Sequence, residues 1–105
     1  MRIAEAWSRG RALILNANRP GYSEAFTFSA EQYEAVRSAI LSELDGGKEV
    51  FLRDVVAAIQ IGLGRSPLFP NGRMTNFVRY VKTDLEARGE VARVLKSSPQ
   101  KIRRV

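Results

Sequence analysis

The chain has 105 residues, enough for one small domain with a single hydrophobic core. Hydrophobic residues make up 45% and charged residues 27%, a balance typical of folded proteins. The absence of cysteine excludes disulfides and thiolate metal sites, and the absence of histidine removes the commonest general base. We therefore expect a protein that is not an enzyme and has neither a metal nor a cofactor.

The first residues lack the apolar run of a signal peptide, and no segment approaches the roughly 20 apolar residues of a membrane span. We therefore expect a cytoplasmic protein without a membrane partner.

Positive charge is concentrated in the second half of the chain. The net charge is +6, but residues 1–52 hold 6 basic and 7 acidic residues. Residues 53–105 hold 11 basic and 4 acidic residues. This asymmetry fits either a polyanionic partner or a basic, solubilising surface, and charge alone favours neither.

In chain order, residues 1–28 are predicted to form an N-terminal arm. A short helix is expected over residues 3–8, followed by short strands over 12–15 and 26–28. Residues 16–21 between these strands are typical of a turn. The strands can form a hairpin, or the arm can be loose, and the sequence leaves both open.

A helix is predicted over residues 30–44. Ser29 and Gln32 have the spacing of a capping box. Apolar side chains recur every three or four residues, at Tyr33, Val36, Ile40, Leu41 and Leu44. The Asp-Gly-Gly that follows is expected to end the helix.

A short strand over residues 48–52 and a second helix over 53–63 come next. The second helix has an apolar stripe of Val55, Val56, Ile59 and Leu63. A loop with two prolines leads to a third helix, expected to start near Asn71 or Gly72 and to end at Gly89. Its stripe is Met74, Phe77, Val78, Val81 and Leu85.

The C-terminal residues are predicted to form a basic hairpin. Val91, Val94 and Leu95 suit a strand, residues 96–99 a turn, and residues 100–105 a returning strand.

This order of elements resembles the winged helix-turn-helix fold over residues 29–105. Residues 81–91 resemble the passage from the third helix into the wing of such proteins. The chain is also similar to a family of small uncharacterised bacterial winged-helix-like proteins, through Leu68-Phe69-Pro70, Phe77 and the segment 84–87. The resemblance implies an α+β domain, with a three-helix core and a small β-wing, preceded by the arm. The long loop before the third helix and the arm itself lie outside the standard pattern.

We expect the third helix to enter the major groove of double-stranded DNA, because Asn and Arg side chains pair with base edges. The residues expected to make contact from this helix are Arg73, Asn76, Arg79, Lys82 and Thr83. The wing is expected to contact the DNA backbone through Lys96, Ser97, Ser98, Lys101 and Arg103.

Two alternatives to DNA binding remain open. The polar face of the third helix also suits plain exposure to solvent. Equally, the domain can be a protein-interaction or structural module, since a fold does not fix a function. In that case the arm would form a homodimer or partner contact through Trp7, Leu13 and Leu15.

Overall fold

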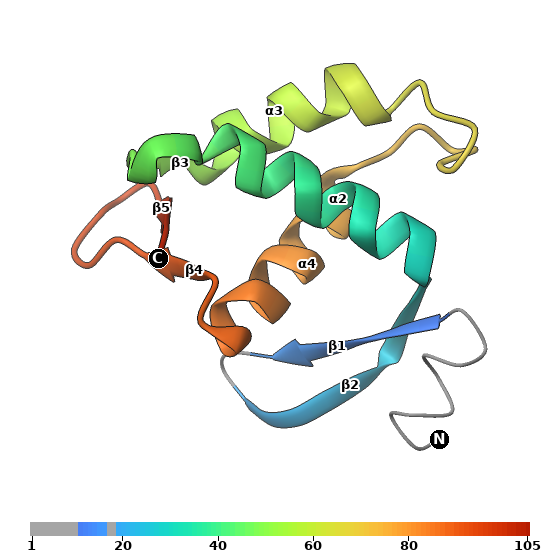
Figure 1. Ribbon diagram of the computed structural model, residues 1–105, viewed down its shortest axis with the longest axis horizontal. Coiled ribbons are helices and arrows are strands. Elements are labelled where there is room, and N and C mark those ends of the chain that lie inside the picture. Colours follow the sequence, from blue (N-terminus) through green and yellow to red (C-terminus); the bar gives the residue numbers. More distant parts are fainter. Residues whose placement is uncertain (1–10, 17–18) are drawn as a thin grey trace.

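The computed structural model describes residues 11–16 and 19–105, with side chains from Ser29 onward. The helix expected over residues 3–8 lies outside the described residues. The elements run in the order β1 (Arg11–Asn16), β2 (Arg19–Ser29), α2 (Ala30–Glu43), a 3-10 turn (Asp45–Gly47), β3 (Val50–Phe51), α3 (Leu52–Leu63), α4 (Thr75–Arg88), β4 (Val91–Arg93) and β5 (Lys101–Arg104). This part of the chain forms an α+β domain, as predicted. Helix α4 lies between the layer of α2 and α3 and the hairpin β1–β2 (Figure 1).

The hairpin of the N-terminal arm is present. Strand β1 pairs antiparallel with β2, from Arg11 opposite Ser29 to Asn16 opposite Arg19. Strand β2 is longer than the predicted segment 26–28, because pairing with β1 extends the strand through the residues expected to turn. The pairing is irregular, with shifts of register between Leu13 and Ile14 and between Leu15 and Asn16. Strand β1 also contacts α4, so the alternative of a loose arm is wrong for the described strands.

Helix α2 begins at the predicted capping box. The Gln32 N–H donates to Ser29 Oγ at 3.0 Å, and the Ser29 N–H donates to Gln32 Oε1 at 3.2 Å. Gln32 Nε2 also donates to the Leu68 carbonyl at 2.8 Å, which ties the start of α2 to the loop between α3 and α4. The predicted helix is confirmed, with Leu44 as its C-terminal cap.

The three predicted stripes meet in one core. Val36, Val55 and Val78, one from each helix, are fully buried. Burying a side chain of this kind contributes about 1.5–3 kcal/mol. Phe69 packs edge-on against Phe77, with 4.9 Å between ring centroids, and so anchors the long loop to the core.

Helix α4 begins at Thr75, later than the expected start near Asn71 or Gly72. The reason is a tertiary contact from α3. Gln60 Oε1 accepts the Met74 N–H at 3.0 Å, and Gln60 Nε2 donates to the Gly72 carbonyl. Gly72 has a φ of +66°, which no helical residue adopts. The end of α4 is as predicted, because Gly89 caps it in the left-handed conformation.

A small antiparallel sheet, in the order β3-β5-β4, covers one end of the helices. Val50 lies opposite Ile102, and Phe51 lies opposite Lys101, so the short strand after α2 pairs with the returning C-terminal strand. Strand β4 ends at Arg93. The prediction of Val94 and Leu95 as strand residues is therefore wrong, and the Leu95 side chain is 86% exposed because the chain already turns at this point.

No described helix is long and apolar enough to cross a membrane.

The Gln60 bridge predicts a loss of stability on truncation. We expect Gln60→Ala to lower the free energy of unfolding by about 1–2 kcal/mol, because the Met74 N–H and the Gly72 carbonyl both lose their partner. Urea denaturation followed by circular dichroism measures this. Ile61→Ala is the control, since Ile61 is the next residue, is 73% exposed, and should change stability by less than about 0.5 kcal/mol. Equal effects of the two substitutions would contradict the bridge.

Candidate nucleic-acid interface

The exposed side of α4 carries only part of the predicted set of contacts. Arg73, Asn76 and Arg79 are exposed. Thr83 is half-buried, and its hydroxyl donates to the Arg79 carbonyl at 2.9 Å, so its hydrogen is already engaged. The predicted contact residues of α4 that are exposed therefore lie in the first half of the helix or just before it.

Lys82 was expected to be exposed and to contact DNA, but the structure shows that it is buried. Its side chain is 5% exposed, and Nζ lies 2.6 Å from Glu86 Oε1, at angles outside those of a hydrogen bond. Lys82 lies one turn after Val78, about 40° around the helix at 3.6 residues per turn. It therefore borders the buried stripe, and its ammonium group is satisfied by an ion pair.

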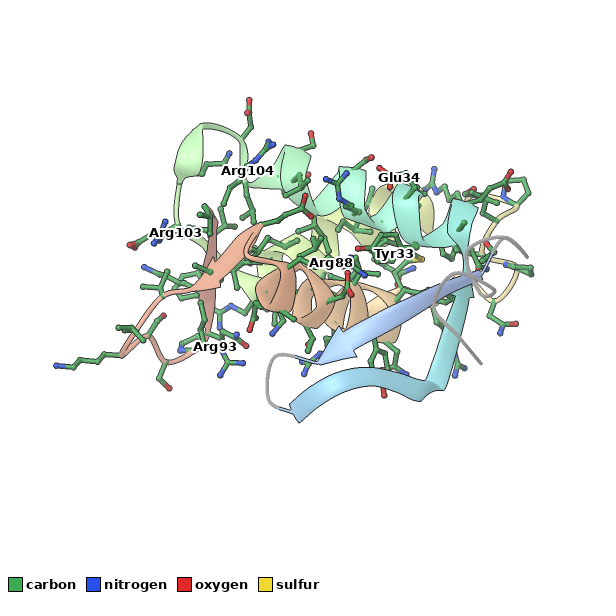
Figure 2. All side chains as sticks on the ribbon, turned by 60° about the horizontal axis from the view of Figure 1, so that its bottom comes forward. Tyr33, Glu34, Arg88, Arg93, Arg103 and Arg104 are labelled. Atoms are coloured by element: carbon green, nitrogen blue, oxygen red, sulfur yellow. The ribbon has the colours of Figure 1, made fainter. Side chains whose placement is uncertain are left out.

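Asp84 is fully buried between α2 and α4. The Tyr33 hydroxyl of α2 and Arg88 Nε of α4 both donate to Asp84 Oδ2, the latter at 2.9 Å. The two donor residues, Tyr33 and Arg88, are labelled in Figure 2. Burial raises the pKa of the Tyr33 phenol, and the hydrogen bond to Asp84 raises that pKa further. Tyr33 therefore remains a hydrogen-bond donor, and Asp84 presents no charge to the surface.

Glu90, just after α4, is also paired. Arg37 of α2 donates to it through Nε at 3.0 Å and through Nη2 at 2.5 Å. These hydrogen bonds hold the pKa of Glu90 below its ordinary value of 4.5. Together with Asp84 and Glu86, every acidic residue from α4 onward is in an ion pair.

The basic residues in the second half of the chain differ from these carboxylates, because most of them form no ion pair with a described residue. Within residues 29–105, no ion pair involves Arg53, Arg73, Arg79, Arg93, Lys96, Lys101, Arg103 or Arg104. Figure 2 shows Arg93, Arg103 and Arg104 spread around the small sheet. The positive charge seen in the sequence is thus uncompensated here.

The predicted wing residues occupy the turn between β4 and β5 and the outer face of the sheet. Lys96 and Ser98 are exposed, whereas the Ser97 hydroxyl donates to the Pro99 carbonyl at 2.6 Å and braces the turn. Lys101 and Arg103 alternate with the buried Ile102, which directs both away from the core. Lys101 Nζ lies 4.8 Å from the centroid of the Phe51 ring.

A cavity of about 140 Å³ joins the wing to the helices. It is lined by Leu52, Arg53, Arg79, Pro99 and Gln100, and so it brings together the start of α3, the outer side of α4 and the end of the turn. Arg53 was not among the residues predicted to bind. The only signal for it in the sequence was its place just after the predicted strand over residues 48–52. No group of acidic residues in the described ranges could hold a metal ion.

The pair of Lys82 and Glu86 predicts an asymmetric response to mutation. Glu86→Gln should lower the free energy of unfolding by about 3 kcal/mol, because it leaves the Lys82 ammonium buried without its counter-charge. The double variant Lys82→Met/Glu86→Leu should recover most of that loss, since a buried ion pair can be replaced by apolar groups. Urea denaturation measures both variants. A double variant less stable than Glu86→Gln would show that the pair is not buried as described.

The pair of Arg37 and Glu90 predicts a dependence on pH. Because the pKa of Glu90 is lowered by folding, its contribution to stability is present above pH 4.5 and is lost as the pH falls through the folded pKa. Glu90→Gln should therefore be less stable than the wild type at neutral pH, and the difference should shrink as the solution is made more acidic than this. Unfolding measured over a pH series tests this, and a constant difference would contradict it.

Comparison with known proteins adds a family but no function. The model of a family of unknown function, DUF6958, matches residues 11–102, from the first described residue of β1 into β5. No curated protein and no solved structure gives a significant match. Since the matched region covers the hairpin, the helices and most of the small sheet, the chain belongs to the DUF6958 family.

Proposed function

We propose that this domain is a winged helix that binds double-stranded DNA, with the first half of α4 in the major groove. The turn between β4 and β5 would lie on the sugar-phosphate backbone. The observation that carries this proposal is the pairing of charges. Asp84, Glu86 and Glu90 are all in ion pairs, whereas Arg73 and Arg79 have no counter-ion among the described residues.

The arrangement of elements supports the winged-helix part of the proposal. A strand between the first two helices of the core, β3, pairs with the last strand, β5. Strand β4 follows α4 directly and pairs with the other edge of β5. This is the arrangement that the sequence resemblance implies.

The surface of α4 supports contact through its first half. Thr75, Asn76 and Arg79 are exposed, while Lys82 and Asp84 in the second half are buried. In helix-turn-helix proteins it is the N-terminal residues of the recognition helix that contact base edges. We therefore propose that Asn76 and Arg79 contact the DNA bases. Lys82 is no longer proposed as a DNA-contacting residue.

The backbone contacts of the proposal come from the wing. Lys96, Ser98, Lys101 and Arg103 of the wing carry hydroxyl and cationic groups suited to phosphate oxygens. Such cations release counterions from the duplex, so salt should weaken binding steeply.

The proposal is tested by comparing two charge reversals of equal size. Arg79→Glu should weaken binding to a duplex of mixed sequence by about tenfold or more, and should reduce the slope of log affinity against log salt by about 1. Fluorescence anisotropy at several salt concentrations measures both quantities.

The matched control is Arg65→Glu, which makes the same change of charge at the far end of α3 from Arg53. Arg65 is also exposed, so the Arg65→Glu variant should fold normally and bind duplex DNA nearly as well as the wild type does. If both variants lose affinity equally, the attraction is a general effect of net charge. If the wild type does not bind duplex at low salt, the proposal is wrong.

A further inference from the structure

The cavity between α3, α4 and the wing turn has the size and the lining of an anion site. Its volume of about 140 Å³ is well above the roughly 10–15 Å³ that a cavity needs to hold one water molecule, and is therefore large enough for a phosphate group. Two of its five lining residues, Arg53 and Arg79, carry guanidinium groups, and none carries a carboxylate. The guanidinium groups come from different helices, so the fold itself brings them to one place.

Both arginines are unpaired. Arg53 and Arg79 are exposed, and neither forms an ion pair with any described residue. The Arg53 guanidinium carbon lies 4.8 Å from the centroid of the Phe51 ring, and Lys101 Nζ lies at the same distance from that ring. Lys101 thus shares the Phe51 ring with Arg53, although Lys101 does not line the cavity. Two guanidinium groups beside a cavity without a counter-ion repel one another, and a bound anion would remove that repulsion.

Backbone donors add to these charges. The cavity adjoins the first turn of α3, a helix of 12 residues whose N-terminal cap, Phe51, makes no side-chain hydrogen bond. The Leu52 N–H donates to the Gln100 carbonyl at 2.9 Å, which fixes the wing turn against this helix end. The following N–H groups, of Arg53 and Asp54, have no hydrogen-bond acceptor in the described ranges. Free N–H groups and the helix dipole both favour an anion here.

Gln100 also lines the cavity, and its Nε2, which is buried, has no hydrogen-bond partner within the described structure. A buried donor without an acceptor is unfavourable. The acidic residues closest in sequence to Arg53, Glu49 and Asp54, are exposed and do not line the cavity.

We propose that this cavity binds one phosphate group through the guanidinium groups of Arg53 and Arg79, beside the first turn of α3. The phosphate can belong to a duplex backbone, in which case the site rests on the proposed function, or to a small phosphorylated ligand. A planar guanidinium group donates two parallel hydrogen bonds to such an oxyanion, which favours arginine over lysine at the site.

The first experiment uses inorganic phosphate and the full chain, without DNA. Backbone amide resonances are followed by NMR during titration at constant ionic strength, with chloride as the control anion. The expected result is a saturable shift of the Arg53 and Asp54 amides. Arg53→Gln should weaken this binding by about tenfold or more, because it removes a charged hydrogen-bond donor. Arg65→Gln is the matched control and should bind as the wild type does.

The second experiment distinguishes the sources of the phosphate. If the site holds a duplex phosphate, Arg53→Gln should reduce the salt slope of DNA binding by about 1, and inorganic phosphate should compete with the duplex. If phosphate binds and Arg53→Gln leaves DNA affinity unchanged, the site takes a small phosphorylated ligand, and the inference stands apart from the proposed function.

Two results would overturn the inference. One is the absence of saturable phosphate binding by the wild type, even where DNA binds. The other is equal phosphate binding by the wild type and by both Arg53→Gln and Arg79→Gln, each shown to be folded by circular dichroism.

Discussion

A fully buried carboxylate within a helix needs donors around it, and Asp84 finds them in Tyr33 of α2 and Arg88 of its own helix. This requirement acts together with the buried apolar stripe of α4 to set the rotation of the helix about its axis. A different rotation would separate Asp84 from Tyr33. Arg79 lies about 140° around the helix from Asp84 at 3.6 residues per turn, so the same constraint directs Arg79 away from α2. The exposed side of α4 is thus a consequence of a contact made on its buried side.

The same helix sorts the charges of the second half of the chain. Its carboxylates are drawn inward and paired, and Glu90, just after the helix, is held by Arg37. Arginines such as Arg79 and Arg103 stay outside without counter-ions in the described structure. Net charge alone does not give the electrostatic potential at a surface, since a paired, buried carboxylate no longer offsets an exposed guanidinium group. The basic character of this surface is therefore stronger than the residue counts alone indicate.

Features that depend on neighbouring residues could be predicted from the sequence, and features that depend on distant ones could not. The capping box of Ser29 and Gln32, the stripes of the helices and the glycine stop at Gly89 are local, and all are confirmed. The late start of α4 depends on Gln60, which belongs to another helix. The burial of Lys82 could not be predicted, because a lysine that borders an apolar stripe can be either exposed or buried. Arg53 lies in the candidate site because β3 pairs with β5 and α3 begins directly after β3. The pairing of β3 with β5 depends on residues far apart in the sequence.

The hairpin of β1 and β2 limits how much of α4 can contact DNA. Strand β1 lies along α4, so one side of that helix is covered by a part of the chain that belongs to no standard winged helix (Figure 1). A major groove is about 12 Å wide, close to the diameter of one helix with its side chains, so a helix flanked by a hairpin cannot enter along its whole length. Entry by its first half brings Arg79 to the DNA together with the turn that ends at Pro99 and Gln100. The cavity between them then lies at the boundary between base contacts and backbone contacts, where a phosphate would fix how deeply the helix is inserted.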